Sequence, residues 1–362
     1  MSNTATLEDI RQRVLNRNRT LSDEVVSVKS LMMDPQHPGR MIVRPGEHAQ
    51  AKDYAFDDRI YGQAAGVAYG LPGAYIKKLV EGDNADPGLA ALNFNFWVDA
   101  SKDKEILLRF ETRGEEKVLR AMKPASWNPI PYEASIETLI TKFGPDHEAI
   151  VEQFDDERLV LNFVTRKLDY KTNPAIHDIG QGRDDPFEWG IRFQDSDVGK
   201  GDLQIMPYSR RLICLNGATA MSKGVIMHIS HSGKDSRVIE EVQATVRQGI
   251  EMVDGYSQRV SEQITASQGI ELECNDEGVP AAAMGRLERD LGVTRLMQKY
   301  VYDGWETEVE HIPERTLYRL TNAVTRAGTH AEELSPDAKL HLQGVGGRML
   351  EMATTNYIWN NN

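Results

Sequence analysis

The spacing of apolar residues along the chain predicts a series of helices. Residues 238–264 carry an apolar stripe at near-3.6 spacing, which predicts an amphipathic helix of about seven turns. Residues 61–80 have helical spacing broken at Gly70-Leu71-Pro72, which favours two short helices over one long helix. The other segments with helical spacing are 7–15, 132–143, 287–302, 315–326 and 336–357.

Alternation of apolar and polar residues predicts strands in the first two thirds of the chain. Residues 105–112 and 117–122 are β-like runs separated by residues 113–116, a plausible hairpin loop that contains a glycine. Residues 92–98 alternate apolar with polar or small side chains, and we interpret this run as a strand too. The other predicted strands are 158–164, 189–193 and 203–206.

These elements predict an α+β fold class. We expect an antiparallel β-hairpin sheet packed with helices, followed by a mainly helical C-terminal region. Residues 1–52 are interpreted as an N-terminal arm, because its short helix is followed by a stretch rich in proline and glycine that is typical of loops. The α+β core would then cover residues 53–237, and an acidic helical region would cover residues 238–362.

Composition limits the class of protein. A chain of 362 residues with 40% apolar and 27% charged residues is ordinary for a globular protein. No apolar run approaches the roughly 18 residues that a membrane-spanning helix needs, and the polar N-terminus lacks the apolar core of a secretion signal. We therefore expect a protein of the bacterial cytoplasm with no membrane partner.

Charge is distributed unevenly along the chain, whose net charge is −13. Residues 238–362 hold 11 Lys and Arg against 20 Asp and Glu, whereas residues 200–237 hold 6 against 2. Residues 11–19 add four arginines without an acid. Since local charge decides contact with nucleic acid better than the total does, the acidity of the chain does not exclude such contact.

The basic segment 209–237 is the most informative stretch of the sequence. Its Asn216-Gly217 pair predicts a hairpin turn, since both residues tolerate positive φ, with 212–215 and 225–229 as neighbouring strands. The cations and histidines expected to gather at one end or edge of it are Arg210, Arg211, Lys223, His228, His231, Lys234 and Arg237. Such cations beside serine hydroxyls and loop amides can hold phosphate oxygens. The residues alone favour the alternative, a solvated basic edge.

Trp127 and Arg120 extend this candidate nucleic-acid-binding set. Aromatic rings flanked by arginines can stack on single-stranded bases while the cations follow the backbone. Most tryptophans in strands belong to the core, but Trp127 lies between prolines in a segment that we expect to be a surface loop.

No constellation predicts catalysis, a metal site or a cofactor. His228 and His231 are three residues apart, so a strand would turn them to opposite faces, without a third ligand nearby. Cys214 lies in an apolar strand pattern and fits a small core residue better than a reactive thiol, and two cysteines cannot build a disulfide framework. Neither a nucleophile elbow nor a phosphate-binding P-loop occurs. An enzyme is therefore the least favoured class.

Four segments in order resemble the phage/plasmid-like proteins grouped as domain of unknown function 932. They are 71–75 with 92–95, 107–130, 189–233 and 316–325. The third is the most specific, with Trp189-Gly-Ile, Asp195-Ser-Asp-Val-Gly199, Arg211-Leu-Ile-Cys-Leu-Asn-Gly217 and His231-Ser-Gly233. Asp197 stands where the family has an acidic residue in an Asn-Ser-Glu-x-Gly stretch, and residues 1–55 have no counterpart in the family pattern.

The resemblance implies a function class rather than a known activity. Members of the family resemble accessory proteins of phages and mobile elements, and the predicted helix, hairpin and basic turn also resemble single-strand-annealing recombinases of the RecT and Erf kind. This implies a phage-encoded protein that binds single-stranded DNA and anneals strands without ATP, as a homo-oligomeric ring or filament in the host cytoplasm. The alternative is a phage structural or interaction protein that self-assembles without nucleic acid.

Overall fold

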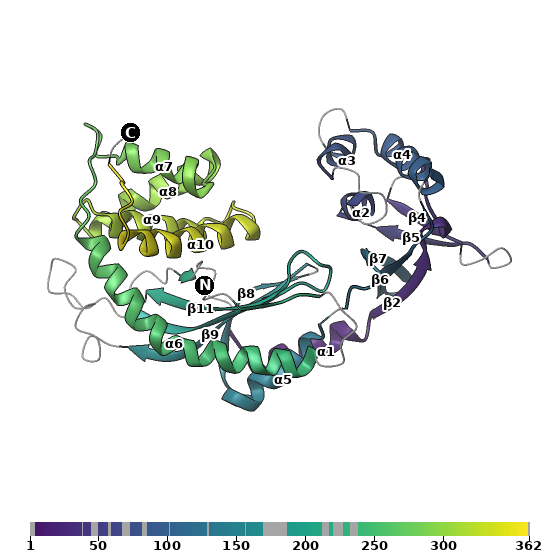
Figure 1. Ribbon diagram of the computed structural model, residues 1–362, viewed down its shortest axis with the longest axis horizontal. Helices are drawn as coiled ribbons and strands as arrows, with labels where there is room; N and C mark the ends of the chain where they lie inside the picture. The colour runs from purple at the N-terminus through teal and green to yellow at the C-terminus, as the bar shows by residue number, and fades with distance from the viewer. Residues whose placement is uncertain are drawn as a thin grey trace.

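Two β-sheets lie side by side in the structure, a computed structural model, and helices cover them (Figure 1). The long helix α6 runs along one of them, and the C-terminal helices lie at the opposite end of the molecule from α3 and α4. The structure describes residues 4–37, 39–44, 50–56, 59–66, 73–81, 85–100, 102–128, 130–155, 157–168, 187–211, 217–219, 227–231 and 238–360.

The sheet from the first third of the chain, called here the N-terminal sheet, has the strand order β2-β6-β7-β5-β4-β3. Its neighbours are antiparallel except for β5 and β7, which pair in parallel. Its strands are β2 (Leu21–Ser27), β3 (Leu31–Met33), β4 (Arg40–Val43), β5 (Lys52–Phe56), β6 (Glu105–Arg113) and β7 (Glu116–Pro124).

The second sheet, called the central sheet, has the order β1-β8-β9-β10-β11-β12, with β13 also paired to β11. All of these described pairs are antiparallel. The strands are β1 (Thr4–Thr6), β8 (Glu148–Phe154), β9 (Leu159–Leu168), β10 (Phe187–Asp195), β11 (Leu203–Arg211), β12 (Gly217–Thr219) and β13 (Met227–Ile229).

The helices pack in three groups. Beside the central sheet are α1 (Leu7–Asn18), α5 (Tyr132–Phe143) and α6 (Val238–Gln268). Around the N-terminal sheet are α2 (Arg59–Ala64), α3 (Gly73–Val80), α4 (Pro87–Ala100) and the 3-10 turn η1 (Val28–Ser30). The C-terminal group comprises α7 (Ala281–Leu291), α8 (Arg295–Thr307), η4 (Glu308–Glu310), α9 (Leu317–His330) and α10 (Pro336–Ala353). Among the described helices, none is long and apolar enough to cross a bilayer.

Each helix group has its own apolar core. One core joins α1, α5 and α6 to the central sheet and includes Leu7, Ile136 and Phe163. A second fills the space between the N-terminal sheet and α2, α3 and α4. The third lies within the C-terminal helices. Burial of these side chains supplies the main driving force for folding.

The structure confirms the α+β class and several of the predicted elements. The hairpin of β6 and β7 turns at Gly114, whose φ of +63° suits glycine. Helix α5 has the predicted bounds. The described residues of the predicted stripe on helix α6 include Val242, Val246 and Val260, which are buried in the core. Two short helices occur where residues 61–80 were expected to hold them: α2 begins two residues before that segment, and α3 lies within it.

Three predictions of secondary structure were wrong. Residues 92–98 belong to helix α4 rather than to a strand. The predicted helix 287–302 is two helices, because Gly292 ends α7 in the left-handed conformation and the Thr294 side chain caps α8. The loop-like part of the predicted arm contains β2, β3 and β4, which are three strands of the N-terminal sheet. The domain boundaries at residues 52 and 237 stay predictions.

Candidate nucleic-acid interface

Two described residues of the predicted nucleic-acid-binding set, Arg210 and His228, lie near opposite ends of β11. Gly217 opens β12 and pairs with Arg210, while His228 on β13 pairs with Gln204 at the other end of β11. At about 3.3 Å per residue, the six-residue step from 204 to 210 separates them by about 20 Å. The predicted turn and strand 212–216, and the cations Lys223, Lys234 and Arg237, lie outside the described residues.

Two of the predicted arginines are buried in ion pairs. Arg211, at the end of β11, is 1% exposed, and its Nη1 lies 2.8 Å from the Glu308 carboxylate on η4. Arg120 on β7 is also buried, with its Nε 3.4 Å from the Glu111 carboxylate on β6. Because a buried charge depends on its partner, these guanidiniums hold the core together and are out of reach of a nucleic acid.

His231 is buried too, and it fastens two loops to each other. Its Nε2 lies 2.9 Å from the Asp195 carboxylate, and its Nδ1 lies 3.1 Å from the carbonyl oxygen of Asn128. The backbone N–H of Asn128 donates to the carbonyl of His231 in return. His231 therefore fixes the segment after β7, which carries Trp127, to the end of β13.

Trp127 stacks on His231, with ring centroids 5.2 Å apart and planes tilted by 28°. The guanidinium carbon of Arg109 and the Nζ of Lys123 lie 5.3 Å and 6.0 Å from the indole centroid. The ring is half-buried, so the surface loop expected around Trp127 is a loop with one packed face. Part of the ring borders a pocket.

This pocket, called here the Lys123 pocket, has a volume of about 360 Å³. It lies where the end of β7 meets the turn between β10 and β11 and the end of β13. Its lining residues are Lys123, Pro124, Ser126, Trp127, Gly199, Gly201, Asp202, Ser230 and His231. Hydroxyl groups, backbone groups, one ammonium and one carboxylate are therefore available in it, together with the edge of an aromatic ring.

Lys123 is the distinctive group of the pocket. Its Nζ donates to the carbonyl oxygen of Gly199 at 3.0 Å, and within the described parts of the chain no carboxylate forms an ion pair with it. Burial lowers the pKa of the Lys123 ammonium. Gly199 has a φ of +73°, and a Cβ there would lie 2.0 Å from Nζ, so only glycine leaves room for the lysine.

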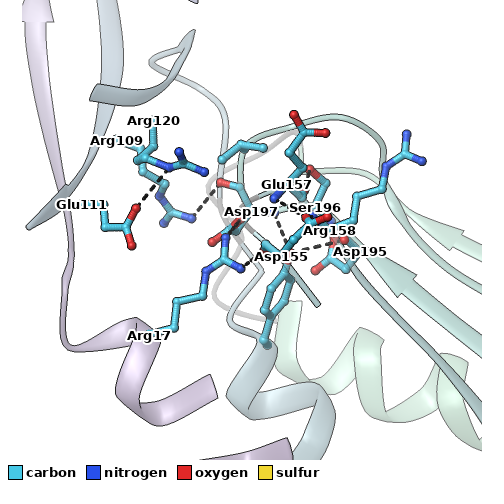
Figure 2. A network of polar contacts seen from close by, with 12 residues as sticks. Arg17, Arg109, Glu111, Arg120, Asp155, Glu157, Arg158, Asp195, Ser196 and Asp197 are labelled. Atoms are coloured by element: carbon cyan, nitrogen blue, oxygen red, sulfur yellow. Dashed lines mark hydrogen bonds and ion pairs between the residues drawn. The ribbon is translucent and has the colours of Figure 1, made fainter. Parts of the chain in front are cut away.

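A network of charged residues holds the turn that carries Gly199 (Figure 2). Arg17 of α1 donates to the Asp197 carboxylate at 2.9 Å, and Arg109 of β6 donates to the Asp197 carbonyl at 3.0 Å. Arg109 also forms a bidentate pair with Asp23 of β2, at 2.8 and 2.9 Å. Burial raises the pKa of Asp197, and the neighbouring arginines oppose that rise. The network joins the two sheets and fixes the turn against Lys123.

Arg210 and His228 remain on or near the surface. Arg210 is half-buried beside β12, and His228 is exposed on β13. His228 and His231 differ in exposure as the strand geometry predicts, and the described residues contain no cluster of three or more metal-binding side chains. His228 and Ser230 are both exposed, and Ser230 directly follows the last residue of β13.

Sequence reasoning missed Lys123 as a site residue. The available signal was its place in the same short proline-flanked segment as Trp127. Comparisons with protein-family models, curated proteins and solved structures gave no match to this chain. The resemblance to the domain of unknown function 932 family therefore stays a prediction.

Proposed function

We propose that this protein binds single-stranded DNA at the Lys123 pocket and anneals complementary strands without ATP. The observation that carries the proposal is a partly buried ammonium, with no carboxylate partner among the described residues, beside an indole ring. A phosphate oxygen can supply the missing negative charge, and the ring can contact a base.

The size and lining of the pocket suit one nucleotide of a longer strand. A volume of about 360 Å³ lies at the lower end of the range for small-molecule sites. Ser126 is an exposed residue of the lining, and its hydroxyl can donate to phosphate oxygens. Asp202 also lines the pocket and repels phosphate, which restricts the phosphate to the side on which Lys123 lies.

A path for the rest of the strand leads from the pocket along β13. Ser230 lines the pocket, and the exposed His228 lies two residues earlier. So few cations bind a strand weakly, and repetition along an oligomer supplies the avidity that annealing requires. In this proposal Arg120, Arg211 and His231 stabilise the fold and do not contact the DNA, because their side chains are buried.

The substitution Lys123→Gln tests the assignment. We expect the affinity for a fluorescent single-stranded oligonucleotide to fall about tenfold or more, as for loss of a charged hydrogen bond. The slope of log Kobs against log salt should become shallower by about 0.7, the value for one phosphate of a single strand. Fluorescence anisotropy over a salt series measures both, and a strand-annealing assay without ATP measures the activity.

Lys142→Gln is the matched control, because Lys142 is an exposed lysine on α5 away from the pocket. It should leave affinity and salt slope unchanged. Equal losses in both variants would show that binding is a diffuse charge effect and would remove the pocket from the proposal. Absence of salt-sensitive binding by the wild-type protein would contradict the function itself and favour self-assembly without nucleic acid.

A further inference from the structure

Helix α4 is apolar on two opposite faces, and only one of them is covered. Ala90, Ala91, Phe94 and Val98 are buried against the N-terminal sheet. The opposite face carries Leu89, Leu92, Phe96 and Trp97, which are 43%, 56%, 66% and 39% exposed. A helix with apolar residues on both faces is normally enclosed. The exposed face, called here the α4 face, has no cover among the described residues of the single chain.

We propose that the α4 face is the contact between two copies of this chain, which are related by a two-fold axis. This inference does not depend on the binding of DNA. Helices α3 and α4 lie at the outer end of the N-terminal sheet, far from the C-terminal helices (Figure 1). A second copy can therefore approach without meeting the rest of the molecule.

The area of the face meets the requirement of a small stable dimer. Four side chains of about 200 Å² each, about half exposed, leave roughly 400 Å² of apolar surface per copy. Tyr75 on the adjoining α3 is 46% exposed, and it adds roughly 100 Å² per copy. A symmetric pair would bury about 1,000 Å² in total, the lower bound for a specific interface.

Charge favours a second copy over a membrane. Two chains of net charge −13 repel each other over most of their surface, so self-association requires a face without charge. Among the residues of α4 the single charged side chain is Asp99, near the C-terminal end. Interfacial helices carry lysines and arginines that attract anionic lipid, and α4 has neither.

Sedimentation of the full chain over a concentration series tests the interface. We expect wild-type protein to reach twice the chain mass of 40.7 kDa. Leu92→Glu should raise the dimer dissociation constant at least about 30-fold, as for a central interface residue. The matched control is Leu296→Glu on α8, whose leucine is 62% exposed outside the face, and it should leave the constant unchanged.

A cross-linking experiment tests the two-fold arrangement. Asn93 lies near the middle of the α4 face. In the Asn93→Cys variant, mild oxidation should therefore join residue 93 of one chain to residue 93 of the second chain through a disulfide. Wild-type protein, which has Cys214 and Cys274, should not. The proposal would be overturned by wild-type protein that stays monomeric, or by equal dimer dissociation constants in the Leu92→Glu and Leu296→Glu variants. It would also be overturned by a monomer that binds neutral phosphatidylcholine vesicles in a way that depends on Leu92.

Discussion

At the scale of single residues, Lys123 depends on backbone atoms and a ring for its surroundings. Its ammonium donates to the Gly199 carbonyl and lies 6.0 Å from the Trp127 centroid. Burial lowers its pKa below the ordinary value of 10.5. At pH values between the lowered pKa and 10.5, Lys123 is protonated more often in the unfolded chain than in the folded chain. In this range the contribution of Lys123 to the free energy of unfolding therefore rises with pH.

Binding of phosphate by Lys123 should change with pH in the opposite direction. The neutral amine cannot pair with phosphate, so oligonucleotide affinity should fall as the pH rises through the lowered pKa. Lys123→Arg keeps its charge throughout this range. We therefore expect wild-type protein to lose affinity as the pH rises, at pH values below 10.5, and the arginine variant to lose less over the same range. Anisotropy titrations at each pH measure this, and parallel profiles would contradict it.

The sequence identifies cations but not their partners. Arg120, Arg211 and His231 looked available for phosphate, yet the folded chain brings Glu111, Glu308 and Asp195 to them. Glu308 lies in a different part of the sequence from Arg211, so no local pattern could reveal that pair. Three residues of the predicted set are thus engaged with carboxylates in the core, whereas Trp127 borders the Lys123 pocket.

At the scale of elements, the sequence predicts helices that have one solvent-exposed polar face, but it did not predict α4. Helices α5 and α6 alternate apolar and polar residues at helical spacing because one side meets the core and the other meets water. In α4, Leu92 and Phe96 are exposed while Phe94 and Val98 are buried. Apolar residues on both faces erase the helical period and leave an apparent alternation of two.

The turn at Gly199 allows a prediction about an element. A methyl group at Gly199 would strain the backbone and displace Lys123, since its Cβ would lie 2.0 Å from Nζ. We expect Gly199→Ala to lower the free energy of unfolding by about 1–3 kcal/mol. Oligonucleotide affinity should fall together with it. Urea denaturation and anisotropy titrations measure the two effects.

The Gly114→Ala variant separates the effect of backbone strain from the effect of displacing the Lys123 side chain. Gly114 has a φ of +63°, but a Cβ there would meet nothing within 4 Å. This variant should lose about 1 kcal/mol of stability through strain alone and keep its affinity. If Gly199→Ala and Gly114→Ala bound the oligonucleotide equally well, the contact of the Lys123 side chain with Gly199 would not matter for binding.

At the scale of the whole molecule, packing crosses the predicted domain boundaries. Leu7 and Val14 of the predicted arm share a core with Phe163 and with Val242 of the predicted helical region. Arg211 of β11 pairs with Glu308 in the C-terminal helices. Composition and turn residues marked where the sequence changes character, but they carry no information on which segments far apart in the chain share a core.

The Arg211–Glu308 pair tests this connection. Glu308→Gln leaves the Arg211 charge buried without its carboxylate, so we expect a loss of about 3–5 kcal/mol in the free energy of unfolding. The double variant Arg211→Met with Glu308→Leu should be less unstable than the single variant, because neither charge remains. Urea denaturation measures both. A single variant as stable as wild-type protein would show that the pair is not coupled to the fold.

The strand order of the sheets has a consequence for synthesis. Thr4 of β1 pairs with Ile150 of β8, and Leu21 of β2 pairs with Glu111 of β6. Translation at roughly 5–20 residues per second places on the order of ten seconds between the emergence of β1 and that of β8. During that interval the earliest strands are open edges on a nascent chain. Strands β1 and β2 thus wait longer for their partners than the strands that follow them in the chain.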